Sequence, residues 1–170
     1  MLSMMASCQT APAEDPLKTS IEKMEVEIKE HVELDTAVAR KLTDAYLEYA
    51  GLHPEDSIAP YYLSRAAEIY KEMPGKALTA VVTYNKVLTA YPESPLAPRA
   101  VFMIGFVFDD KLKDSTRAVK SYNHFLKEYP NHPMADDARQ LLQMLSDTLS
   151  EEEMVKMWME KNKTDTNDTK

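Results

Sequence analysis

The chain has 170 residues, 44% of them hydrophobic, and its 20 Lys and Arg against 28 Asp and Glu give a formal net charge of −8. This length predicts one domain that can bury a core of its own. The acidic balance, with its basic residues scattered, argues against nucleic acid as a partner. No apolar run in the sequence approaches the roughly 20 residues that a membrane-spanning helix needs, and three dispersed glycines exclude most phosphate-binding loops.

Apolar residues recur every three or four positions along the chain, and the alternation typical of strands is absent. This spacing predicts an all-α protein with helices at residues 18–33, 36–50, 59–72, 76–90, 96–109, 114–128, 134–148 and 151–161. Gly51 suits the left-handed C-terminal cap of the second helix, and Pro74 with Gly75 suits a turn between two helices. Consecutive helices then form four antiparallel pairs.

Several residues return at an offset of 38 positions. Because proline cannot continue a helix, each repeated proline ends one helix, and the alanine that follows it begins the next. The repeated sets are Pro54, Pro92 and Pro130; Ala59, Ala97 and Ala135; and Tyr46, Tyr84 and Tyr122. A fixed period of this size indicates a repeat architecture in which each helix pair stacks on the next.

Two of these pairs resemble the tetratricopeptide repeat, whose first helix carries a large residue, Leu, a small residue and an aromatic, and whose second carries Ala, an aromatic and a closing Pro. The first unit has Leu63, Ala66, Ala67, Tyr70, Ala80, Tyr84, Val87 and Pro92, and the second has Val101, Ile104, Gly105, Phe108, Ala118, Tyr122, Phe125 and Pro130. The resemblance covers about residues 36–148. It implies a right-handed α-solenoid of tetratricopeptide-like hairpins over residues 18–161, with a C-terminal capping helix.

The small residues of these units imply close contact between helices, so that a leucine at Gly105 would overpack the interface. The first helix pair fits the family pattern less well. Glu25 and Lys29 stand there in place of a large apolar residue and a small one.

The connectors between pairs carry the string Tyr-Pro-x-x-Pro-x-Ala, which begins at Tyr91 and again at Tyr129. These long connectors resemble those of tetratricopeptide proteins in the bacterial envelope. Two such proteins are the lipoprotein subunit of the outer-membrane β-barrel assembly machine and the periplasmic coordinator of the Tol-Pal system.

Cys8 follows Met5, Ala6 and Ser7, and small residues before a cysteine near the start of a chain resemble the lipobox of bacterial lipoproteins. Residues 1–17 are therefore expected to hold a truncated lipoprotein signal and a tether, with Cys8 as the site of lipid attachment. Acyl chains alone would then hold an outer-membrane lipoprotein whose body faces the periplasm. A free cysteine in a frayed start is the alternative. Residues 162–170 are expected to be a disordered tail.

The candidate binding site is the concave surface, which in this family is lined by the first helix of each pair. By the matched positions it carries Tyr61, Ser64, Glu68, Lys71, Arg99, Phe102, Phe106, Asp109, Gln140 and Met144. Phe102 and Phe106 share one helical face, where two exposed aromatics would bind a peptide. The alternative is that this helix is buried on every side, covered by the apolar residues of the last helix.

No nucleophile motif, zinc-protease histidine pair or phosphate-binding loop is present, so we expect neither an enzyme nor a metal or other cofactor. His31, among Glu30, Glu33 and Asp35, fits a solvated helix end better than a metal site. Asp109 with Asp110, and Asp136 with Asp137, could form the facing carboxylates of a hydrolase. Adjacent helical residues point in different directions, and acids at a helix start complement its dipole, which favours a structural role.

The leading hypothesis is a non-enzymatic interaction scaffold of the bacterial cell envelope, attached to the membrane through its lipid alone. It would bind an envelope protein or a peptide segment and assist outer-membrane protein assembly or Tol-Pal-like coordination. The alternative is a cytosolic tetratricopeptide adaptor that binds a peptide in the same groove.

Overall fold

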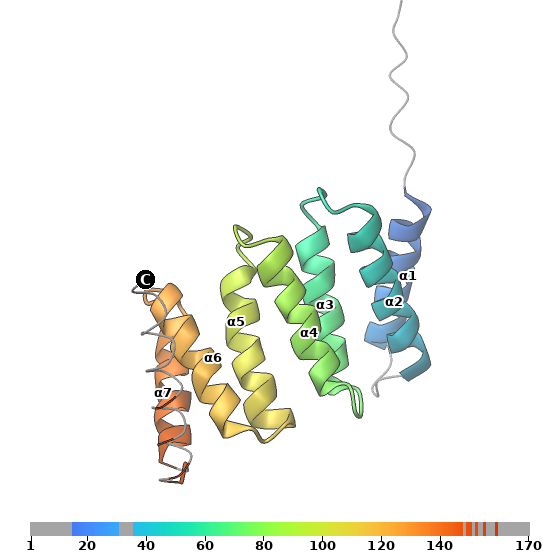
Figure 1. Ribbon diagram of the computed structural model, residues 1–170. Helices are drawn as coiled ribbons and strands as arrows, with labels where there is room; N and C mark the ends of the chain where they lie inside the picture. The colour runs from blue at the N-terminus through green and yellow to red at the C-terminus, as the bar shows by residue number, and fades with distance from the viewer. Residues whose placement is uncertain are drawn as a thin grey trace, which may run out of the picture.

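The computed structural model describes residues 15–30, 36–147, 149–150, 152, 155 and 159 (Figure 1). Within these residues the chain forms helices and connecting turns, stacked as hairpins side by side, which confirms the predicted all-α solenoid. Each helix packs chiefly against the helix before it and the helix after it. The elements are α1 Pro16–Glu30, α2 Thr36–Leu52, α3 Ala59–Glu72, α4 Ala77–Ala90, α5 Ala97–Phe106, the π-helical η1 Val107–Lys111, α6 Ser115–Glu128 and α7 Ala135–Ser146.

Several sequence predictions lie outside the described residues. These are the lipid attachment at Cys8, the acidic group around His31 and the tail at residues 162–170. Of the predicted last helix, Glu152, Val155 and Met159 are described, and all three are helical and exposed.

The connectors repeat down to their hydrogen bonds. Helices α3, α5 and α7 begin at the predicted alanines, Ala59, Ala97 and Ala135. Ahead of each alanine, a side chain accepts the backbone N–H two residues on: Ile58 N to Asp56 Oδ1 at 3.0 Å, Leu96 N to Ser94 Oγ at 3.2 Å and Met134 N to His132 Nδ1 at 3.2 Å. Because a helix start leaves its first N–H groups without intrahelical partners, three different residue types serve the same purpose here.

The two predicted glycine positions have different outcomes. Gly75 has a φ of +71°, which confirms the turn between α3 and α4. Gly51 lies inside α2, which continues to Leu52, so the predicted left-handed cap is wrong. In the next hairpin the position equivalent to Gly75 is Lys113, whose φ of 52° lies in the region that favours glycine.

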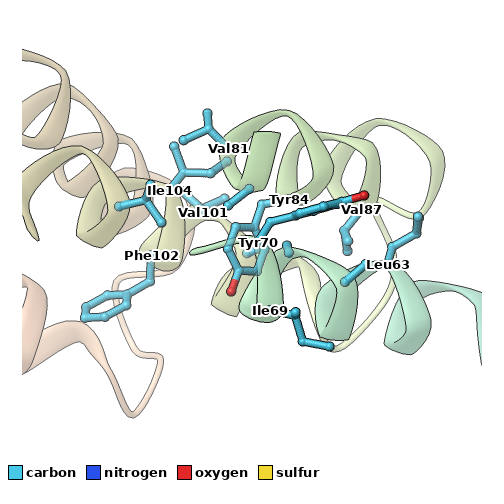
Figure 2. Packing of buried hydrophobic residues seen from close by; sticks show 14 of the residues in the cluster. Leu63, Ile69, Tyr70, Val81, Tyr84, Val87, Val101, Phe102 and Ile104 are labelled. Atoms are coloured by element: carbon cyan, nitrogen blue, oxygen red, sulfur yellow. The ribbon is translucent and has the colours of Figure 1, made fainter. Parts of the chain in front are cut away.

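Tyr46, Tyr84 and Tyr122 occupy the same place in three successive hairpins, and each is at most 1% exposed. Figure 2 shows Tyr84 among the apolar side chains of this core, with Val87 and Leu63 nearby. The Tyr46 hydroxyl donates to Glu25 Oε1 at 2.5 Å. Glu25 is the repeat equivalent of Leu63 and Val101, so its departure from the family pattern supplies an acceptor that the apolar residues cannot. The buried hydroxyls of Tyr84 and Tyr122 have no hydrogen-bond partner within the described part of the chain.

This difference predicts opposite outcomes for the same substitution. Tyr46→Phe should lower the free energy of unfolding by about 1–2 kcal/mol, because it leaves the Glu25 carboxylate without its donor. Tyr84→Phe and Tyr122→Phe should leave stability unchanged or raise it, since each removes a buried hydroxyl that no protein group satisfies. Urea denaturation followed by circular dichroism measures all three. Equal losses at the three positions would contradict the assignment of Glu25.

Gly105 of α5 lies directly against the ring of Tyr122 on α6. A Cβ added there would lie 2.8 Å from Tyr122 Cε1 and 2.9 Å from Tyr122 Cδ1, well inside van der Waals contact. Because Tyr122 is fully buried, its ring can give way only by displacing other core side chains. The close contact inferred from the small residues is therefore present at Gly105.

Gly105→Ala should accordingly lower the free energy of unfolding by about 1–3 kcal/mol. Gly51→Ala is the matched control, because Gly51 is also helical and a Cβ there meets nothing within 4 Å. That control should gain up to about 1 kcal/mol from helix propensity. Thermal unfolding of both variants gives the sign, and a Gly105→Ala protein as stable as the control would show that Tyr122 repacks without cost.

Candidate functional site

The predicted binding residues lie on α3, on α5 with η1, and on α7. These are the first helices of three successive helix pairs. We call their non-buried part the first-helix surface. Tyr61, Arg99, Gln140 and Met144 are exposed on it, and Glu68, Lys71, Phe106 and Asp109 are half-buried. Tyr61 is 43% exposed and Met144 66%. The structure therefore leaves eight of the ten predicted residues accessible in some degree and buries the other two.

Phe102 is one of the buried two, at 6% exposure, and the expectation that it lines an exposed face is wrong. Its ring lies 5.5 Å from the ring of Tyr122 and 5.6 Å, edge to face, from that of Phe125. These are the spacings of packed aromatic pairs. Helix α5 is apolar on nearly every side. The face that carries Phe102, which the family pattern leaves exposed, is covered by α6 in this structure.

Ser64 is the second predicted binding residue that the structure buries, at 7% exposure. Its hydroxyl donates to the carbonyl oxygen of Pro60 at 2.9 Å, one turn back in α3. Because that bond stays within the helix, Ser64 offers no donor to a partner.

Phe106 follows Phe102 by one turn and stays half-buried. The ammonium of Lys71 lies 5.3 Å from the centre of its ring, within the range of a cation–π contact. Helix α3 therefore supplies a cation that partly covers the one aromatic of α5 that remains accessible.

Two ion pairs join α3 to the next hairpin, and we call them the cross-hairpin ladder. Arg99 Nη2 lies 2.7 Å from Glu68 Oε1, and Lys111 Nζ lies 3.0 Å from Glu72 Oε2. Lys71 Nζ is also 2.8 Å from Glu72 Oε1. The ladder thus links one first helix to the next across the hairpin boundary.

The lysines hold the pKa of the Glu72 carboxyl below its usual range, through hydrogen bonds from Lys71 and from Lys111. The Glu72 side chain is 51% exposed, so water and salt screen these charges. Exposed pairs of this kind stabilise a fold by about 0–1 kcal/mol at most. The ladder therefore contributes more to the arrangement of charges than to stability.

The π-helical turn η1 places Lys111 within reach of Glu72. A continuous α-helix was predicted over residues 96–109, but α5 ends at Phe106 and the wider turn runs to Lys111, closed by Leu112 N to Val107 O at 3.1 Å. Single π-helical turns within helices are frequent at functional sites.

Comparison with known families adds a match over the two central hairpins. Residues 61–94 and 99–132 each match the tetratricopeptide repeat. The first match runs from α3 through α4, and the second from α5 through α6. No curated protein matches the chain.

The matched repeats are the two that the cross-hairpin ladder joins. Tetratricopeptide repeats typically build non-enzymatic scaffolds for protein–protein interaction, because stacked hairpins present a long surface. Tyr61 and Arg99 occupy equivalent positions in the two repeats, so their side chains recur along that surface at the spacing of one hairpin.

Two of the four candidate catalytic acids form ion pairs with nearby cations. Asp110 lies 3.3 Å from Lys111 Nζ, and Asp136 lies 2.6 Å from Arg139 Nη1. Across the ranges that the structure covers, no three His, Cys, Asp or Glu residues are grouped to hold a metal ion. None of the helices described is long and apolar enough to cross a membrane.

Sequence reasoning missed Glu72 and Lys111, which form half of the ladder. Their signal was the repeat register, because Lys111 lies one period and one residue after Glu72. Only the wider turn of η1 brings that extra residue to the facing position.

Proposed function

We propose that the chain is a non-enzymatic scaffold of the bacterial cell envelope whose first-helix surface binds a segment of another envelope protein. In this proposal Cys8 is acylated and holds the solenoid at the outer membrane, where it assists outer-membrane protein assembly or Tol-Pal-like coordination. The lipobox-like residues before Cys8 and the envelope-like connectors support the location.

One observation carries the binding surface: each of three consecutive first helices presents an accessible large side chain, Tyr61 from α3, Arg99 from α5 and Met144 from α7. Tyrosine and arginine are the residue types that most often dominate binding energy at interfaces, and methionine adapts to varied apolar partners. The ion pair between Arg99 and Glu68 links the helices that carry the first two of these side chains, so the surface continues from α3 to α5.

Site-specific crosslinking in cells tests the surface. A photoreactive residue placed at Tyr61 or at Met144 should capture the same envelope protein, and Arg99→Glu should reduce both adducts. Leu52 is the control position, since it is 64% exposed but belongs to α2, a second helix, and not to the first-helix surface. Equal capture from Leu52, or capture unaffected by Arg99→Glu, would oppose this surface as the binding site.

The location needs a separate test. Expressed in a bacterial cell with an outer membrane, the protein should incorporate a labelled fatty acid and sediment with outer membranes, and Cys8→Ser should abolish both. If the protein is instead recovered from the cytosol without the fatty-acid label, and the crosslinks are still formed, the envelope role is wrong and the protein is a cytosolic adaptor.

A further inference from the structure

The second helices, α2, α4 and α6, carry exposed residues that do not belong to the first-helix surface, and on α4 these are apolar. Leu78 is 54% exposed and Val82 57%, and the two lie one turn apart. The residues at the equivalent positions of the other repeats are Arg40 and Asp44 in α2, and Thr116 and Lys120 in α6. Since the same fold carries polar side chains at these positions in two other hairpins, packing within the chain does not require leucine and valine there.

The exposed face of α4 suits contact with an identical helix. Leu78, Val82, Asn85 and Thr89 are all exposed, and their spacing of four, three and four residues is that of the contact seam in paired helices. Helix α4 contains no carboxylate, and Lys86 is its single charged residue. Two such faces placed together therefore bring apolar and uncharged side chains against each other.

Opposite charges flank this face. In the stack of second helices, α4 comes between α2 and α6 (Figure 1). Asp44 and Glu48 are exposed on α2, and Lys127 is exposed on α6. Neither Glu48 nor Lys127 has an ion pair within the described part of the chain. Both charges are therefore available to a second molecule.

These charges distinguish two ways of pairing α4 about a two-fold axis. With the axis along α4, the two helices run parallel, and α2 of each copy faces α6 of the other. With the axis across α4, the helices run antiparallel, so α2 faces α2 and the carboxylates oppose each other. The first arrangement sets opposite charges face to face, and the second sets like charges face to face.

The repeat register puts Glu48 and Lys127 within reach of each other in the parallel arrangement. Glu48 is equivalent to Lys86 of α4, and Lys127 to Thr89. Three residues correspond to about 4.5 Å along a helix axis, a distance that two long side chains can span.

We propose that α4 pairs in parallel with α4 of a second copy of this chain, in a two-fold dimer. Leu78 and Val82 of each copy contact those of the other, and Glu48 of each α2 pairs with Lys127 of the opposite α6. The first-helix surface takes no part in this contact, so each dimer leaves two such surfaces open to partners. The dimer does not depend on the function proposed above.

Sedimentation velocity of the whole chain over a range of concentrations tests this proposal, and we expect a monomer–dimer equilibrium. Val82→Asp should raise the dissociation constant by about tenfold or more, because it brings two carboxylates together at the axis. Val26→Asp is the matched control, since Val26 is 56% exposed but lies on α1. A chain that stays monomeric at every concentration overturns the proposal, as does a dimer that both variants weaken equally.

A charge exchange tests the flanking contact. Glu48→Lys and Lys127→Glu should each raise the dissociation constant by about threefold or more, because the dimer contains this pair twice. The two changes combined should restore the dimer. Lys23→Glu makes the same charge change at an exposed residue of α1 and should have little effect. A double variant as weak as the two single changes predict together would rule out this pairing.

Disulfide crosslinking tests the direction of the helices, in a chain that also carries Cys8→Ser. Mixed Leu78→Cys and Thr89→Cys chains should form intermolecular disulfides between chains with the same substitution, because a parallel pair brings identical residues to the axis. Disulfides formed chiefly between the two different variants would show antiparallel helices and overturn the parallel dimer.

Discussion

Phe102→Ala is expected to lower the free energy of unfolding by about 3–5 kcal/mol, the usual cost of removing a buried aromatic ring. Phe102 is 6% exposed and packs against the rings of Tyr122 and Phe125, so alanine leaves a cavity between α5 and α6. Urea denaturation followed by circular dichroism at the helical band measures the loss.

Phe106→Ala is the matched control, because the same ring is removed one turn further along α5. Phe106 is half-buried and its main charged neighbour is Lys71, so we expect a loss of about 1 kcal/mol. A small loss at Phe102, similar to that at Phe106, would contradict the packing described. Binding studies should therefore alter Phe106 and leave Phe102 in place.

Raising the pH above about 10 is expected to unfold the protein, because buried tyrosines must lose their protons. Burial raises the pKa of Tyr46, Tyr84 and Tyr122 well above the ordinary value near 10, and the Glu25 carboxylate adds to the shift at Tyr46. Since the folded-state pKa is raised, the stability from these phenols is complete below about pH 10 and is lost as the pH rises toward the folded values. Each of these three tyrosines lowers the free energy of unfolding by about 1.4 kcal/mol for every pH unit above 10. Together they lower it by about 4 kcal/mol near pH 11.

Tyr49 adds to the same transition. A hydrogen bond to Asp56, 2.6 Å long, together with burial, raises the pKa of Tyr49 to about 12. Helical circular dichroism and phenolate absorbance, recorded together against pH, should change in one cooperative step. Tyr84→Phe should move that step to higher pH, since one linked phenol is removed. Titration of all nine tyrosines near pH 10 with the helices intact would contradict the burial described here.

The repeat period made much of the fold predictable from sequence. Pro54, Pro92 and Pro130 located the connectors, and the alanines after them are the first residues of α3, α5 and α7. The predicted bounds of α3, residues 59–72, agree with the structure, because the proline before the helix and the Pro-Gly turn after it both restrict the backbone.

The candidate site was less predictable, and α5 shows why. Its sequence is apolar on nearly every side, so periodicity cannot say which face α6 covers, and Phe102 was assigned to the wrong one. The π-helical turn escaped prediction because it depends on the backbone's wider hydrogen-bond spacing, which side-chain periodicity does not report. The outward position of Tyr61 could be inferred, since α3 has a clear apolar stripe and Tyr61 lies off it.

Because each helix packs chiefly on its two neighbours in the chain, the solenoid has few contacts that tie its ends together. Its hairpins can therefore open one after another from either end while the centre stays folded. Amide hydrogens of α3 to α6 should exchange most slowly with solvent, and those of α1 and α7 much faster. A partner bound across α3, α5 and α7 would slow exchange at the C-terminal end as well, so binding would be visible as protection of the amide hydrogens of α7.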